Sequence, residues 1–97
     1  MKRSNAHTIG ELLRDFFQDN PDLRKRILDI RIRRGWSEVL GSSIQQYTRN
    51  LYIKNEILYV SLTSSVLRSE LMLSREKLVK SLNEYAGSTV IRDIVIR

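Results

Sequence analysis

The spacing of apolar residues changes from a helical to a strand period near Thr48, and this change constrains the fold more than any other feature of the sequence. Before Thr48, apolar residues recur every three or four positions, which is typical of amphipathic helices. From Leu51 to Val60 they alternate with polar or aromatic residues, which is typical of strands. A chain of 97 residues folds around one hydrophobic core, so helices and strands must share it. The sequence therefore predicts a single α+β domain with helices packed on one face of a sheet.

The first expected helix covers residues 8–20. Thr8 and Glu11 have the spacing of a capping box, in which each side chain accepts a hydrogen bond from the other residue's backbone N–H. Apolar residues follow at helical spacing: Ile9, Leu12, Leu13, Phe16 and Phe17. We expect the helix to end near Asn20, because the proline at position 21 disfavours helical geometry at the residue before it.

A second helix is expected over residues 21–33, since proline is well suited to the first turn of a helix. Its predicted apolar stripe is formed by Leu23, Ile27 and Ile30, with Leu28 beside them. Gly35 is expected to interrupt this helix before a third helical segment that ends near Tyr47. The stripe of that segment comprises Trp36, Val39, Leu40 and Ile44, and we assign the first three of these to the core.

The alternating segment is interpreted as a hairpin. If Asn55 and Glu56 form a two-residue turn, Ile53 lies opposite Leu58 and Leu51 lies opposite Val60, so that one face is apolar. Tyr52 then meets Tyr59 on the other face. Glu56 occupies a position where glycine would relieve the positive φ of a type I′ turn, so a longer loop stays open as an alternative.

The rest of the chain completes the α+β order. A long helical segment is expected from Ser64 or Ser65 to Ala86, with Ser74 as a point where it could divide and Gly87 as its end. A last strand is expected over residues 89–97, because apolar residues dominate it. We expect residues 1–7 to be a flexible N-terminus and residues 8–97 to be one domain.

The charge of the chain favours a polyanionic partner. Lys+Arg number 17 against 11 Asp+Glu, which gives a net charge of +6 and a pI near 10.1. The excess is concentrated in one short run, and the candidate nucleic-acid-binding residues are Arg24, Lys25, Arg26, Arg31, Arg33 and Arg34 of this run, together with Lys54. The alternative is a solvated helix, since Asp22 with Arg26, Lys25 with Asp29, and Asp29 with Arg33 have the i,i+4 spacing of local ion pairs.

Catalytic chemistry is poorly supported by these residues. The single histidine is His7, and the chain has no cysteine, so it has neither a metal-ligand set nor an activated nucleophile. The four glycines form no phosphate-binding loop. We expect no catalytic residue, no metal, no cofactor, no small-molecule substrate and no membrane span, and hence a cytoplasmic protein.

The outer face of the hairpin is a second candidate surface. Tyr52 and Tyr59 stand together there, with Lys54 near the turn, and this combination could stack bases beside a cation or contact a protein partner. Ordinary cross-strand packing, or burial under another part of the chain or a second subunit, is the alternative.

The order of residues also resembles the DciA family of bacterial proteins, long catalogued only as a domain of unknown function, in the short form found in Bacteroidetes. The resemblance rests on Trp36, Val39-Leu40-Gly41, Tyr47-Thr48, the run LYIKNEILYVSLTSSVLRSEL from Leu51, REKL from Arg75, LNEYAG from Leu82 and VIRDIVIR from Val90. It implies a KH-like domain of the second topological type, in the order helix, strand, strand, helix, helix, strand. It also implies a nucleoid-associated role in DNA replication, in which such proteins bind DNA and assist loading of the replicative helicase.

Two departures from the expected pattern qualify that function. KH domains that bind RNA use a G-x-x-G loop, whereas Leu71-Met72-Leu73-Ser74 stands at the corresponding place. Longer relatives carry an extension outside the domain, and we expect this chain to be the domain alone. The leading hypothesis is a non-enzymatic module that binds single- or double-stranded DNA and a replicative helicase. The alternatives are a protein-interaction adaptor without direct nucleic-acid binding and a KH-like RNA-binding protein.

Overall fold

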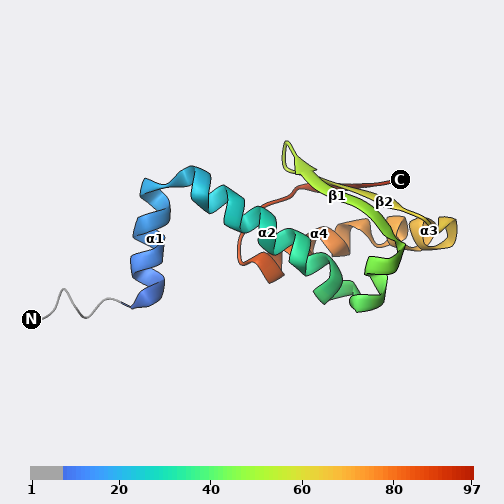
Figure 1. Cartoon of the computed structure of the whole chain (residues 1–97), viewed down its shortest axis with the longest axis horizontal. Coiled ribbons are helices and arrows are strands. Elements are labelled where there is room, and N and C mark those ends of the chain that lie inside the picture. Colours follow the sequence, from blue (N-terminus) through green and yellow to red (C-terminus); the bar gives the residue numbers. More distant parts are fainter. Residues whose placement is uncertain (1–7) are drawn as a thin grey trace, which may run out of the picture.

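A computed structural model describes residues 8–97, and the expected flexible segment 1–7, with His7, lies outside the described residues. The elements follow in the order α1 (Ile9–Asp19), α2 (Pro21–Leu40), the 3₁₀ helix η2 (Ser42–Tyr47), β1 (Thr48–Lys54), β2 (Ile57–Leu62), α3 (Ser65–Leu73), α4 (Arg75–Ala86) and β3 (Asp93–Ile96) (Figure 1). The α+β class is confirmed. From α2 onward the order of helices and strands is the expected one, apart from the short η2.

The sheet of the described chain has three strands in the order β1-β2-β3. β1 pairs with β2 in antiparallel fashion, and β2 pairs with β3 in parallel fashion, so β2 is the central strand. Helices α2 and α4 pack on each other and, with α3, against the sheet. The most deeply buried side chains come from all these layers: Ile32, Trp36, Leu58, Val60, Leu82, Ile91 and Ile94. One core therefore joins the sheet to its helices.

The hairpin has the predicted register. Ile53 pairs with Leu58, Leu51 with Val60 and Tyr52 with Tyr59. Asn55 and Glu56 form the two-residue turn with φ of 53° and 65°. Glu56 adopts this left-handed conformation without the help of glycine, at a cost of about 1 kcal/mol, because the apolar register of the two strands leaves no other turn length.

Gly35 does not interrupt α2, and that prediction was wrong. The helix continues through it to Leu40 and ends at Gly41, whose φ is 96°. Gly35 lies where α2 crosses α4, and a Cβ atom there would lie 2.9 Å from Cδ1 of Tyr85. The glycine is therefore required by helix packing rather than by a chain break. The third predicted segment is divided between the end of α2 and η2.

The predicted apolar stripe of α2 was also wrong. Leu23 and Ile30 are exposed and Ile27 is half-buried, whereas the core-facing residues are Leu28, Ile32, Gly35 and Trp36. Arginines 31, 33 and 34 interrupt the apolar pattern on both sides of Ile32 and so conceal this face in the sequence. Of the three residues assigned to the core, Trp36 is buried and Leu40 packs against the core, but Val39 is exposed.

Predictions for the C-terminal part are largely confirmed. Ser74 divides the long helical segment into α3 and α4, and Gly87 ends α4 in the left-handed conformation with φ of 81°. The last strand is shorter than expected and begins at Asp93, because residues 89–92 form a loop that α4 holds through hydrogen bonds. Ile91 belongs to this loop and is nevertheless almost fully buried in the core.

Candidate nucleic-acid interface

A basic groove lies where the start of α2, the hairpin turn and the loop before β3 meet. Its volume is about 940 Å³. Cationic side chains line it from three elements: Arg24 and Lys25 of α2, Lys54 at the end of β1, and Arg92 before β3. Asp29 and Glu56 are the acids in the same lining. We call this surface, defined by Arg24, Lys25, Lys54 and Arg92, the basic groove.

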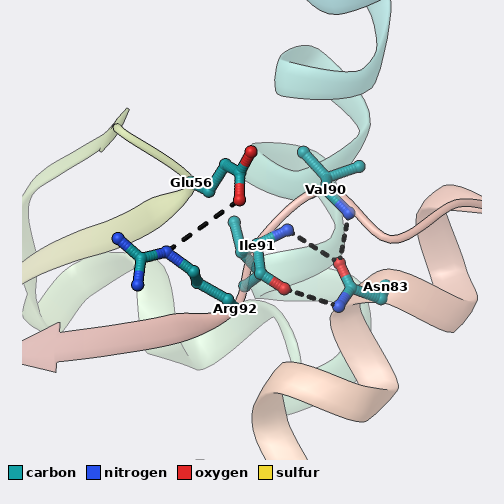
Figure 2. Close-up of polar contacts among 5 residues, drawn as sticks. All are labelled: Glu56, Asn83, Val90, Ile91 and Arg92. Carbon is teal, nitrogen blue, oxygen red and sulfur yellow. Dashed lines mark hydrogen bonds and ion pairs between the residues drawn. The ribbon is translucent and has the colours of Figure 1, made fainter.

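Asn83 of α4 fixes the backbone of the loop whose residues Thr89, Val90 and Arg92 line one side of the groove (Figure 2). Its Oδ1 accepts hydrogen bonds from the backbone N–H groups of Val90 at 2.9 Å and Ile91 at 3.1 Å. Its Nδ2 donates to the carbonyl oxygen of Ile91 at 2.8 Å. Three hydrogen bonds from one half-buried amide hold the loop in a single path, because each loop group would otherwise lack a partner away from water. Arg92 follows directly and is thereby placed at the groove.

Arg92 and the hairpin turn are joined twice. The backbone N–H of Arg92 donates to the carbonyl oxygen of Glu56 at 2.8 Å. Its guanidinium Nε lies 3.9 Å from Oε1 of Glu56, with both side chains largely exposed (Figure 2). Such a long, solvated ion pair contributes little energy, so Arg92 stays able to exchange Glu56 for another anion. The sequence pattern gave no indication of Arg92, because it stands beside Asp93 in a mainly apolar segment and belongs to no cluster of cations.

The predicted basic run is spread around α2 rather than gathered on one face. Arg24 donates from Nη2 to Oγ of Ser88 at 3.1 Å, and Arg31 donates from Nη1 to the carbonyl oxygen of Ala86 at 3.1 Å. Both arginines therefore brace the end of α4, where a cation near the last carbonyls is favourable. Arg26, Arg33 and Arg34 are exposed away from the basic groove.

One of the predicted local ion pairs is present among the described residues. Nε of Arg33 lies 2.7 Å from Oδ1 of Asp29, with both side chains partly exposed. The pairs Asp22 with Arg26 and Lys25 with Asp29 are not formed in this part of the chain. The solvated-helix interpretation therefore accounts for Arg33 but leaves Lys25, Arg26 and Arg34 exposed for a partner.

Tyr52 and Tyr59 form a closed stack. Their ring centroids lie 5.0 Å apart with an interplanar angle of 12°. The guanidinium of Arg97 lies 5.2 Å from the centroid of Tyr59 and donates from Nη2 to the hydroxyl of Tyr52 at 2.8 Å. Cross-strand packing thus uses the facing surfaces of both rings, as the alternative interpretation expected. Lys54 lines the basic groove together with Arg24 and Lys25.

Two further chemical features of residues 8–97 complete the description. In this range no three Asp, Glu or His side chains gather in a way that could hold a metal ion. No helix in the same range combines the length and apolar character needed to cross a bilayer. The chemistry that the groove does offer is that of Arg and Lys side chains, which bind phosphate and carboxylate groups.

The fold and the groove together define a small α+β domain with a cationic groove on its surface. The model of the family described as "Dna[CI] antecedent, DciA" matches residues 8–96. The chain therefore belongs to the DciA family, which is associated with loading of the replicative helicase and is not a family of catalytic enzymes. No curated protein and no solved structure matches the chain.

Proposed function

We propose that this chain is a non-enzymatic module of DNA replication that binds DNA through the basic groove while it acts on a replicative helicase. The observation that supports DNA binding is the convergence of Arg24, Lys25, Lys54 and Arg92 from three separate elements. Cations so arranged neutralise neighbouring phosphates and release condensed counterions, which provides most of the affinity of non-specific DNA binding. A role on chromosomal DNA places the protein at the nucleoid.

The remaining cations of α2 contribute to the proposal in different ways. Arg26 and Arg34 are exposed and lie outside the groove, so they would extend the cationic field without forming its centre. Arg31 is committed to the carbonyl oxygen of Ala86, and Arg33 to Asp29. A charge reversal at Arg31 would therefore lower the stability of the protein as well as any DNA binding, and the two effects could not be separated.

Fluorescence anisotropy with labelled single-stranded and duplex oligonucleotides, at several salt concentrations, tests the DNA half of the proposal. If about four phosphates are contacted, log K should fall against log salt with a slope of roughly −3 to −4 on duplex DNA. A slope near zero, or no binding at low salt, would reject it. Comparing the two oligonucleotides identifies the preferred strand state.

A matched pair of variants tests the groove itself. Lys25→Glu with Lys54→Glu changes two exposed lysines in the groove, and Lys77→Glu with Lys80→Glu changes two exposed lysines on α4 outside it. Both variants lower the net charge by the same amount. The groove variant should weaken DNA binding at least about tenfold more than the α4 variant, since each lost phosphate contact lowers affinity and the salt slope. Equal losses would mean diffuse attraction and would reject the groove.

The adaptor alternative is supported by the exposed apolar side chains of α1 and is tested by capture of the host's replicative helicase with and without DNA. Helicase capture by a wild-type chain that itself binds no DNA would favour a pure adaptor. RNA binding has less support, because the single residue Ser74 joins α3 to α4 and leaves no room for a G-x-x-G loop. Competition between single-stranded RNA and DNA tests that alternative.

A further inference from the structure

The apolar side of α1 is uncovered in the described chain. The exposed fractions of Ile9, Leu12, Leu13 and Phe16 are 75%, 55%, 47% and 48%, and no residue of this helix is buried against the rest of residues 8–97. A helix of 11 residues is marginal by itself in water, and helices of this kind obtain their stability from packing an apolar face. The apolar side of α1 therefore needs a partner.

α2 of the same chain cannot fold back to cover the apolar side of α1. Asn20 alone connects the two helices, whereas antiparallel helix pairs need a connection of about two to five residues. Asn20 is held in place because its Nδ2 donates to the carbonyl oxygen of Phe16 at 2.8 Å and its backbone N–H donates to that of Phe17 at 3.2 Å. Pro21 then starts α2 in a new direction, and α1 projects from the domain (Figure 1).

The outer side of α2 carries a second exposed apolar strip. Leu23 and Ile30 are 38% and 51% exposed, and Tyr85 of α4 is 42% exposed. Ile27, Ile30 and Tyr85 line a shallow depression of about 370 Å³ together with Arg31 and Arg34. This outer strip is defined by Leu23, Ile27, Ile30 and Tyr85. Helical spacing places Leu23 and Ile30 on the side of α2 opposite the core-facing residues, and Ile27 and Tyr85 at the edge where α2 meets α4. None of the four residues lines the basic groove.

The charges of the two surfaces are complementary. Along α1 the ionisable residues are Glu11, Arg14, Asp15 and Asp19, a net charge of −2. Along α2 the six cations exceed Asp22, Asp29 and Glu38, which gives +3. Arg26 and Arg34 flank the outer strip, and Asp15 and Asp19 flank the apolar side of α1 at helical spacing. An acidic apolar helix thus matches a basic apolar strip, which favours α1 on α2 over α1 on α1.

We propose that two copies of this chain form a twofold dimer in which α1 of each copy packs on the outer strip of the other. Such an isologous pairing uses both surfaces twice. Each contact covers only one short helix and one strip of apolar side chains, so we expect weak self-association, with a dissociation constant on the order of micromolar. The basic groove stays open in the dimer.

Sedimentation velocity of the whole chain from about 1 to 300 µM tests the pairing, because this range spans a micromolar equilibrium. The wild type should shift from monomer to dimer. Leu12→Glu with Phe16→Glu, and separately Ile30→Glu, should raise the dissociation constant at least about tenfold, since each places a charge in the apolar contact. Circular dichroism shows that each variant is folded.

The control is Val66→Glu with Leu73→Glu, which changes two exposed apolar residues of α3 outside the interface. It should dimerise like the wild type. A wild type that stays monomeric at every concentration, even if α1 captures another protein, overturns the proposal. So does dimerisation that survives the α1 variant or is lost equally in the α3 control.

Charge exchange tests which helix meets which. Asp15→Lys with Asp19→Lys, and Arg26→Glu with Arg34→Glu, should each weaken self-association, because α1 and the outer strip then carry like charges. Mixing the two variants restores opposite charges at both contacts and should restore the dimer as a heterodimer. Failure of the mixture to associate would reject the pairing of α1 with α2.

Discussion

The two N-terminal helices differ in a way that neither sequence pattern suggests. α1 has the clearer amphipathic pattern and a complete capping box, in which Glu11 N–H donates to Oγ1 of Thr8 at 3.1 Å, yet it buries no side chain within residues 8–97. α2 has a weak apolar pattern and carries six cations, yet it supplies Ile32 and Trp36 to the centre of the core.

The difference teaches that amphipathicity indicates that a helix has a partner, but not where the partner lies. α2 lies across the sheet and α4, so a short apolar segment from Leu28 to Trp36 suffices to anchor it. α1 lies beyond the edge of the domain, so its apolar side, from Ile9 to Phe16, stays open. The following predictions compare matched substitutions in packed and unpacked helices.

The largest difference is expected for truncation of an aromatic residue. Trp36→Ala should reduce the free energy of unfolding by about 3–5 kcal/mol, because Trp36 is 1% exposed and its loss leaves a cavity. It also removes the hydrogen bond from Nε1 to Oγ1 of Thr48. Phe16→Ala in α1 should change it by less than about 1 kcal/mol. Urea denaturation at low micromolar protein concentration measures both, and similar losses would mean that α1 packs on the core.

Glycine substitution gives the next contrast. Gly35→Ala should destabilise the protein by about 1 kcal/mol, since a Cβ atom 2.9 Å from the ring of Tyr85 costs more than the gain in helix propensity. Gly10→Ala in α1 meets Oγ1 of Thr8 at 3.8 Å and should gain helix content instead. Thermal unfolding and far-ultraviolet circular dichroism measure the two effects. A stabilising Gly35→Ala would contradict the close contact of α2 with α4.

Removal of an N-cap should lower the global stability of the protein when the helix is packed, but should loosen only the helix itself in α1. Ser64→Ala removes the acceptor of the Leu67 N–H at the start of α3, which buries Leu71, and should cost about 1 kcal/mol of unfolding free energy. Thr8→Ala should speed amide exchange within α1 while global stability changes by less than about 0.5 kcal/mol. Hydrogen exchange resolved by residue separates the outcomes, and equal global losses would reject the contrast.

The smallest effect is expected for the surface ion pair. Arg33→Ala should change the free energy of unfolding by less than about 0.5 kcal/mol, because Arg33 and Asp29 are both partly exposed and solvent screens them. Arg31→Ala, which removes a hydrogen bond to the carbonyl oxygen of Ala86, should cost more, about 1 kcal/mol. Chemical denaturation measures both. A larger loss of unfolding free energy for Arg33→Ala than for Arg31→Ala would mean that the exposed ion pair stabilises the fold.

The sequence shows which residues of α2 are cationic but not where each of them lies, for a physical reason. Cations could be counted along α2, but the side of the helix that each one occupies depends on which side faces the core. That side was concealed because Ile32 stands between arginines. The sequence therefore could not tell which cations of α2 line the groove, which hydrogen-bond to the end of α4 and which stay exposed. Lys54 joins Arg24 and Lys25, and Arg92 completes the groove, through contacts between segments far apart in the sequence.

Local interactions let the sequence by itself determine the hairpin register, the capping box of α1, the division at Ser74 and the end of α4 at Gly87. Each of these depends on residues within a few positions of one another, whose backbone preferences and alternation act locally. Tertiary structure alone decided that α2 runs through Gly35, that Arg92 reaches the basic groove and that α1 stands apart. These depend on which surfaces meet in three dimensions, and packing between distant segments overrides local preference there.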